Sequence, residues 1–116
     1  MLDAYNANPS SVDAALINFA AMKGAHKVVF LGEMSELGSD SPQEHLAILK
    51  QLQSYGFEKN VLVGNKFMEH RSVFPANYFA TSDEAAQWAK TQNLQNAIIL
   101  IKGSRSVKME KVLDSL

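Results

Sequence analysis

Lys27-Val28-Val29-Phe30-Leu31-Gly32 is a short, almost wholly apolar stretch that ends at a glycine. This composition is typical of a strand buried on both faces of a parallel sheet. Three more short runs rich in β-branched or aromatic residues follow along the chain, at residues 60–64, 77–80 and 97–101. We therefore expect a sheet built from short, buried strands.

Helical patterns lie between these runs. Pro9 suits the first turn of a helix, and Asn8 suits its cap. The apolar residues that follow recur at helical spacing: Val12, Ala15, Leu16, Phe19 and Ala20. Ser41-Pro42 repeats the start signal, and Gly56 is suited to end this second helix. Its expected buried face carries Leu46, Leu49 and Leu52.

The second half of the chain predicts three more helices. Residues 65–71 form a short one that stops before Pro75, and Ser82 is expected to cap the next. The last helix has four apolar residues on one face: Met109, Val112, Leu113 and Leu116. Helices that alternate with buried strands predict one α/β domain over residues 1–116, with a mostly parallel sheet and helices on both faces.

The composition excludes several classes of protein. The chain has 116 residues, 47% of them apolar, and a net charge of −1, so it has room for a core but lacks the basic excess of a dedicated nucleic-acid binder. No apolar run approaches the roughly 18 residues of a membrane span and the sequence shows no signal-peptide pattern, so we expect no membrane insertion. The absence of cysteine excludes disulfides, thiol catalysis and cysteine-ligated zinc, and it fits a cytoplasmic protein.

The three histidines, His26, His45 and His70, are too widely spaced to form a metal-binding pair. We expect each of them to be a solvated surface side chain. The alternative for His45, which lies near the start of the helix after the acidic loop, is that it faces the site. We also expect no metal site in this chain.

Four polar turns follow the predicted strands, at residues 3–8, 32–41, 64–66 and 102–105. In a parallel sheet, such turns meet at the carboxyl edge, where α/β proteins hold their ligands. The sequence therefore predicts a binding site at this edge.

The turn Lys102-Gly103-Ser104-Arg105 closes a hydrophobic strand and opens the last helix. Glycine permits close approach of a ligand to the backbone, a helix start offers free N–H groups, and arginine can grip a carboxylate in a forked pair. This pattern favours a site for a carboxylate or a phosphate. A capped helix start with solvated cations explains the same residues equally well.

The turn from Gly32 to Gly38 carries two carboxylates, Glu33 and Glu36, in a connection longer than most in α/β units. Paired acids can bind an ammonium group, a ribose or a magnesium ion. The alternative is an ordinary loop whose acids face water.

In the first turn, Asp3 and Asn6 could bind a ribose and an adenine edge, and Tyr5 could stack on a base. Asp and Asn are also routine turn formers and caps, which is the alternative here. The chain contains neither G-x₄-G-K-[ST] nor G-x-G-x-x-G. If it binds a nucleotide, it supplies one wall of a shared site.

Three motifs together carry a resemblance to a known family. They are Asp3-x-Tyr5-Asn6-Ala7-Asn8-Pro9, then Leu31-Gly32-Glu33-Met34-x-Glu36-Leu37-Gly38 with His45 seven residues later, and finally Lys102-Gly103-Ser104-Arg105 followed by Met109-Glu110. In this order and spacing, the chain resembles the C-terminal domain of the bacterial Mur ligases over essentially its whole length.

The resemblance implies a Rossmann-like domain from a three-domain enzyme. The N-terminal domain of such an enzyme holds the UDP-sugar, and the central domain carries the P-loop and most of the Mg²⁺ contacts. Because only Met1 and Leu2 precede Asp3, we expect the chain to be an excised domain that is inactive alone. We also expect it to pack against its own N-terminal and central domains.

The motifs are most similar to those of the family members that act on D-alanyl-D-alanine. The implied reaction uses ATP to activate the terminal carboxylate of UDP-N-acetylmuramoyl-tripeptide as an acyl phosphate. The amine of D-alanyl-D-alanine then attacks it, in the last cytoplasmic peptide addition of bacterial peptidoglycan synthesis.

The resemblance also implies roles for individual residues, none of them catalytic. The ATP wall would comprise Asp3, Tyr5, Asn6 and Asn8. The D-alanyl-D-alanine pocket would comprise Glu33, Met34, Glu36, Asn65, Lys102, Ser104 and Arg105, with Lys102 or Arg105 pairing with the carboxylate of the dipeptide.

Two alternatives from other classes stay open at this point. Asp3 and Lys102 at strand ends suggest a receiver-like or flavodoxin-like binding module, although a receiver needs an aspartate after its middle strand, where this chain has Gly64-Asn65. A docking domain whose polar turns are only caps is the other alternative.

Overall fold

The computed structural model describes residues 2–3, 7–104 and 107–116. Its sheet has five strands, β1 (Leu2–Asp3), β2 (Lys27–Gly32), β3 (Lys59–Val63), β4 (Asn77–Phe79) and β5 (Ile98–Lys102). Their order across the sheet is β1-β5-β2-β3-β4, and every pair is parallel. The prediction of buried strands in a parallel sheet is therefore confirmed, with strand ends shifted by one residue at most places.

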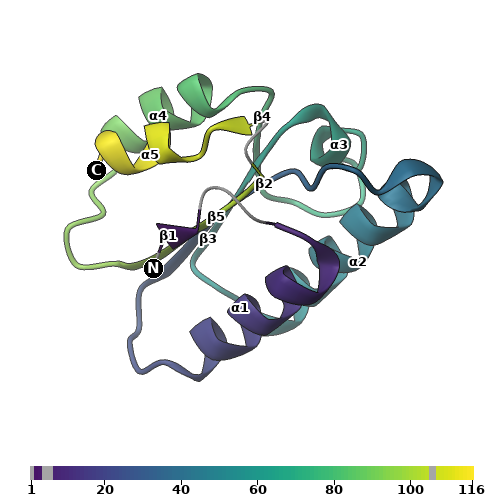
Figure 1. Ribbon diagram of the computed structural model, residues 1–116. Helices are drawn as coiled ribbons and strands as arrows, with labels where there is room; N and C mark the ends of the chain where they lie inside the picture. Colours follow the sequence, from purple (N-terminus) through teal and green to yellow (C-terminus); the bar gives the residue numbers. More distant parts are fainter. Residues whose placement is uncertain (1, 4–6, 105–106) are drawn as a thin grey trace.

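Helices cover both faces of this sheet (Figure 1). On one face lie α1 (Pro9–Ala21), α2 (Ser41–Tyr55) and the short α3 (Asn65–Met68), with a 3₁₀ turn at Gly38–Asp40 before α2. On the other face lie α4 (Ser82–Lys90) and α5 (Glu110–Asp114). The result is the three-layer α/β architecture that the alternating pattern predicts.

The alternation of side chains along β2 divides the core into two layers. Val29 and Leu31 face the core under α1 and α2, where Leu16, Phe19, Leu49 and Leu52 are buried. Val28 and Phe30 face the core under α4 and α5. Because successive side chains in a strand point to opposite faces, a strand buried on both sides is apolar throughout.

The helix ends agree with the sequence at two places and differ at a third. The side chain of Asn8 accepts a hydrogen bond from the N–H of Ser11 and caps α1. Gly56 ends α2 in the left-handed conformation, with a φ of 65°. The prediction that Ser82 caps α4 is wrong: Thr81 is the cap, in a capping box with Glu84, and Ser82 is buried.

The last helix also differs in which residues it buries. Met109 and Val112 pack into the core as expected. Leu113 and Leu116 are 44% and 49% exposed, so the prediction that they share the buried face is wrong. Five residues make less than two turns of helix, and a helix this short buries only the side chains nearest the sheet.

Candidate functional site

Strand β5 marks the place in the sheet where ligands are expected. It lies between β1 and β2. The chain after β1 and after β2 leads to helices on one face, whereas the chain after β5 leads to α5 on the other. In open α/β sheets, the crevice at such a switch, outside the carboxyl ends of the strands, is the usual ligand site.

The polar turns meet at this edge, as predicted. Asp3 is level with Lys102 in the sheet, Lys102 is level with Leu31, and Gly32 is level with Val63. The strand ends therefore bring four stretches that are distant in sequence to one edge. The carboxyl ends of β1, β5, β2 and β3 form this edge, which we call the carboxyl-edge site.

The turns after β2 and β5 contact each other directly. The hydroxyl of Ser104 donates a hydrogen bond to the main-chain carbonyl of Glu33, with an O–O distance of 2.8 Å. A Cβ atom added at Gly103 would lie 3.3 Å from the Cα of Gly32 and would collide with the side chain of Met109. Glycine at position 103 is thus required by the packing of this chain itself, a reason that differs from the ligand approach inferred from the sequence.

Glu33 joins the β2 turn to the start of α3. Its carboxylate accepts a hydrogen bond from the main-chain N–H of Lys66 at 3.3 Å, and the Nζ of Lys66 lies 3.8 Å from its other oxygen. The carboxylate lies directly over Gly64, where a Cβ would collide with it. The side chain of Glu33 is 17% exposed, so its carboxylate is held in a fixed position at the rim of the site.

His45 packs beneath this site in an environment that differs from the predicted one. It is fully buried, so the prediction of a solvated surface histidine is wrong for this residue. Its Nε2 accepts the main-chain N–H of Met34 at 2.9 Å, and its Nδ1 lies 2.7 Å from the main-chain carbonyl of Ser41. The two contacts require a neutral ring with the proton on Nδ1, because a carbonyl can only accept.

A signal for the burial of His45 is present in the sequence. His45, Ile48, Leu49 and Leu52 are the buried residues of α2, and they follow the spacing i, i+3, i+4, i+7 of a helix face. Leu46 is only half-buried. The buried face of α2 therefore begins at His45, one residue before the predicted Leu46.

Burial lowers the pKa of His45 below 6.5, and this desolvation is the largest influence on it. The hydrogen bond to the Ser41 carbonyl and the negative charge of Glu33 act in the opposite direction, whereas Lys66 and His70 add to the lowering. The neutral ring that the hydrogen bonds require is therefore also the form that burial favours.

The remaining predicted pocket residues fall into exposed and buried groups. Glu36 and Asn65 are exposed at the edge of the site, and Glu36 has a positive φ of 65°. Lys102 and Ser104 are each only 4% exposed, so the alternative of a solvated cation is wrong for Lys102. Met34 is fully buried in the core, which leaves only its main-chain atoms to face a ligand.

The predicted ATP wall is described in part. The backbone of Asp3 lies beside Lys102, and the side chain of Asn8 is engaged in capping α1. Tyr5, Asn6 and Arg105 lie outside the described residues, and their assignments stay predictions.

Two other features bear on ligands. Among the described residues, no group of three or more His, Asp or Glu side chains is arranged to hold a metal ion, and no helix there is long and apolar enough to cross a membrane.

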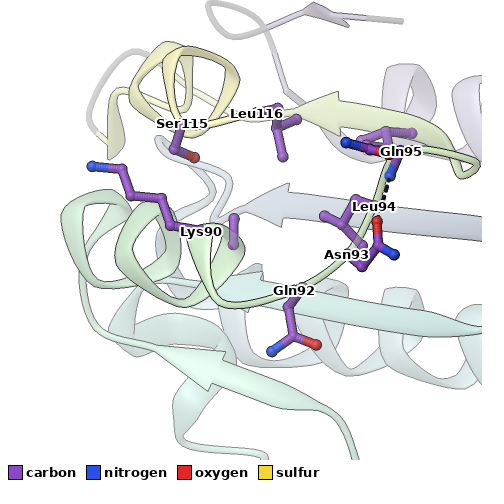
Figure 2. A pocket seen from close by; sticks show the side chains of 9 residues that line it. Lys90, Gln92, Asn93, Leu94, Gln95, Ser115 and Leu116 are labelled. Carbon is purple, nitrogen blue, oxygen red and sulfur yellow. Dashed lines mark hydrogen bonds between the residues drawn. The ribbon is translucent and has the colours of Figure 1, made fainter.

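A separate pocket of about 260 Å³ lies near the amino end of β5, lined by residues that include Lys90, Gln92 and Leu116 (Figure 2). It lies at the opposite edge of the sheet from the carboxyl-edge site.

Comparisons with known proteins identify the family. The model of the family described as "Mur ligase, glutamate ligase domain" matches residues 1–105. UDP-N-acetylmuramoyl-tripeptide–D-alanyl-D-alanine ligase from Buchnera aphidicola is 33% identical over 98% of this chain, and the Escherichia coli ligase of the same name is also 33% identical over 98%. This chain spans about a quarter of the length of these relatives, 26% in each case.

Solved structures agree with the sequence comparisons. A crystal structure of MurF from Acinetobacter baumannii superposes with a TM-score of 0.81 at 31% identity, covering 97% of this chain and 26% of that one. MurF ligase from Thermotoga maritima, in complex with ADP, has the same fold with a TM-score of 0.76 at 20% identity, again covering 97% of this chain and 26% of that one. The chain therefore belongs to the Mur ligase family and corresponds to its glutamate ligase domain.

Proposed function

We propose that this chain is the C-terminal domain of a cytoplasmic bacterial ligase that joins D-alanyl-D-alanine to UDP-N-acetylmuramoyl-tripeptide. Residues 1–116 form one of three domains of that enzyme. The other two hold the UDP-sugar and the P-loop, and this domain packs against them and contributes the wall that completes the site. The similarity of essentially the whole chain to ligases of this name supports the assignment.

The reaction has two steps with balanced atoms. The γ-phosphoryl group of ATP passes to the terminal carboxylate of the tripeptide, which gives an acyl phosphate and ADP. The ammonium group of bound D-alanyl-D-alanine gives one proton to water, and the resulting free amine then attacks the acyl carbon. A C–N bond forms, the C–O bond to phosphate breaks, inorganic phosphate leaves and the nitrogen loses its second proton to water. Magnesium ions bound mainly by the central domain would offset the phosphate charge.

In this proposal, the carboxyl-edge site is the pocket for the dipeptide. Glu33 and Glu36 face its ammonium end, and Lys102, Ser104 and Arg105 face its carboxylate, where a forked arginine contact is strongest. Asn65 and the main chain of Met34 complete the pocket. Asp3, Tyr5, Asn6 and Asn8 form the wall that faces ATP.

One observation carries this proposal: the Glu33 turn, the start of α3 and the Lys102–Ser104 turn are bonded to one another at a single edge. The ion pair of Glu33 with Lys66 and the hydrogen bond from the Ser104 hydroxyl to the main-chain carbonyl of Glu33 hold the Glu33 carboxylate and the turn after β5 in one frame. Such a frame can hold both ends of a zwitterionic dipeptide and present its amine to the acyl phosphate, and positioning of this kind is a large part of catalysis in acyl transfer. Closure of the domain also excludes water from the acyl phosphate.

Steady-state kinetics of the full-length ligase test the proposal. The measurement is ATP-dependent phosphate release with UDP-N-acetylmuramoyl-tripeptide while D-alanyl-D-alanine is varied. Arg105→Ala is expected to raise the KM for the dipeptide about tenfold or more, because a charge-assisted hydrogen-bonded pair is lost. Arg71→Ala removes the other arginine of residues 1–116, which is exposed, and is expected to leave this KM unchanged. If Arg105→Ala leaves the KM for the dipeptide unchanged, Arg105 is not part of the dipeptide pocket.

A further inference from the structure

The imidazole of His45 is fully buried and is not among the groups proposed to face the dipeptide or ATP. It contacts three different segments of the chain. Nε2 accepts the N–H of Met34 at 2.9 Å, Nδ1 donates to the carbonyl of Ser41 at 2.7 Å, and the ring packs edge-on against Phe67 at 4.7 Å between centroids. His45 thus links the turn after β2 to the first turn of α2 and to α3 through two hydrogen bonds and a ring contact.

The hydrogen bond to His45 lies between the two acidic residues of the turn after β2. Met34 directly follows Glu33 and lies two residues before Glu36, so the imidazole fixes the main chain between the two carboxylates. The carbonyl of Met34 also accepts the Nζ of Lys66 at 3.4 Å, which is the cation that pairs with Glu33. Both polar groups of the Met34 main chain are therefore bonded to side chains of the frame.

The turn also has a shape that needs support. Glu36 has a φ of 65°, a left-handed conformation that is costly for a residue with a side chain and persists only when its surroundings hold it. The buried Met34 side chain and the His45 hydrogen bond anchor the turn two residues earlier. An apolar residue at position 45 would fill the same core but would leave the buried N–H of Met34 without its acceptor.

We propose that His45 is the positioning residue of the dipeptide pocket: through the main chain of Met34 it holds the two carboxylates, Glu33 and Glu36, in the arrangement that receives the ammonium end of the acceptor. This inference rests on the proposed function, because that function supplies the dipeptide whose ammonium group the two carboxylates would bind. It assigns His45 no contact with the substrate.

The hydrogen bond that His45 accepts from Met34 depends on pH. A proton on Nε2 would remove the acceptor and place a second N–H against the N–H of Met34. The charged and titratable groups that act on the ring are Glu33, Lys66 and His70, together with the Ser41 carbonyl. The pocket is therefore formed with neutral His45 and loosens when His45 is protonated.

The test compares two variants in the full-length ligase. His45→Gln keeps an oxygen acceptor at the end of a side chain of similar reach, whereas His45→Leu fills the space without an acceptor. We expect His45→Leu to raise the KM for D-alanyl-D-alanine about tenfold, as expected for an unsatisfied buried donor, while the KM for ATP stays near the wild-type value. His45→Gln is expected to restore most of the dipeptide affinity. His26→Leu, at an exposed histidine near Glu58, is the matched control.

Two further readouts separate positioning from simple packing. As pH drops through the folded-state pKa of His45, which burial holds below 6.5, kcat/KM for the dipeptide is expected to fall more steeply in wild type than in His45→Gln. Hydrogen exchange in the full-length protein is expected to be faster across residues 33–38 in His45→Leu and near wild type in His45→Gln. If His45→Leu does not fold, the comparison of wild type with His45→Gln over pH still decides the matter.

The outcomes distinguish the two proposals. A well-folded wild type without dipeptide-dependent phosphate release overturns the proposed function, and this inference with it. An active wild type in which His45→Leu leaves the dipeptide KM unchanged, or raises both KM values equally, overturns the positioning role alone. An active wild type whose pH profile is identical to that of His45→Gln also overturns it.

Discussion

At the scale of single residues, His45 couples the stability of the domain to pH. Burial lowers the pKa of the folded-state imidazole below 6.5, so around that pH the unfolded chain binds a proton that the folded chain does not. The contribution of neutral His45 to the free energy of unfolding is therefore complete above pH 6.5. It declines as pH falls through 6.5 and levels off below the folded-state pKa.

We predict that wild type loses unfolding free energy between about pH 7.5 and about pH 5.5, and that His45→Gln loses less over the same interval. Urea unfolding at constant ionic strength measures both slopes. His26→Gln is the control, because its side chain is exposed beside Glu58, and it should keep the wild-type slope. Equal slopes for wild type and His45→Gln would mean that His45 is not the linked group.

Gly64 shows how the backbone holds Glu33 in place. It has a φ of 115° and a ψ of 153°, a region that is essentially restricted to glycine, and the Glu33 carboxylate occupies the space of its missing side chain. We predict that Gly64→Ala destabilises the domain by about 2 kcal/mol or more. Gly56→Ala, at a left-handed helix end with open space around it, should cost about 1 kcal/mol. Urea unfolding midpoints compare them, and a smaller loss for Gly64→Ala would contradict the account.

The turns that form the candidate site were predictable from the sequence where the signal is local. Glycines, acids and cations at strand ends identify the turns, because the carboxyl ends of parallel strands must meet. The burial of His45 and Lys102 was not predicted, since it depends on which elements pack over them. The spacing of His45 with Leu49 and Leu52 was the available signal.

At the scale of elements, two helices on opposite faces of the sheet, α1 and α4, begin with capping boxes. Asn8 bonds the N–H of Ser11 at the start of α1, and Thr81 bonds the N–H of Glu84 at the start of α4. We predict that Asn8→Ala and Thr81→Ala each lower the free energy of unfolding by about 1 kcal/mol. Asn8→Asp, which keeps the acceptor, should lose less.

The same variants test whether Asn8 does more than cap α1. In the full-length ligase, a raised KM for ATP in Asn8→Ala but not in Thr81→Ala would support its place in the ATP wall. If the two variants are equal in stability and in KM for ATP, Asn8 is a cap only.

The type and sequence of elements were predictable, but their arrangement was less so. Apolar runs of four to six residues and helical stripes identify β2, β3, β5, α1 and α2 within a residue or two. The insertion of β5 between β1 and β2 is absent from the local pattern, because strand order depends on pairing between distant segments. Ser82 and Thr81 are both capping residues by type, and only the backbone conformation distinguishes them.

At the scale of the whole molecule, the domain holds part of a site that the proposed enzyme completes. The described residues provide an edge of fixed charges and no metal-binding cluster, and the sequence has no P-loop. We predict that residues 1–116 alone bind ATP and D-alanyl-D-alanine with dissociation constants weaker than about 1 mM. Isothermal titration calorimetry measures both, and tighter binding of either ligand would contradict the shared-site account.

Phosphate release by the full-length ligase tests the central claim most directly. The assay supplies ATP and UDP-N-acetylmuramoyl-tripeptide and varies the acceptor, with D-alanyl-D-alanine compared with its N-acetylated form, which lacks the free amine. The account predicts saturable phosphate release with the free dipeptide and none above background with the blocked one. A well-folded enzyme that releases no phosphate with D-alanyl-D-alanine, or that releases it equally with both acceptors, would contradict the account.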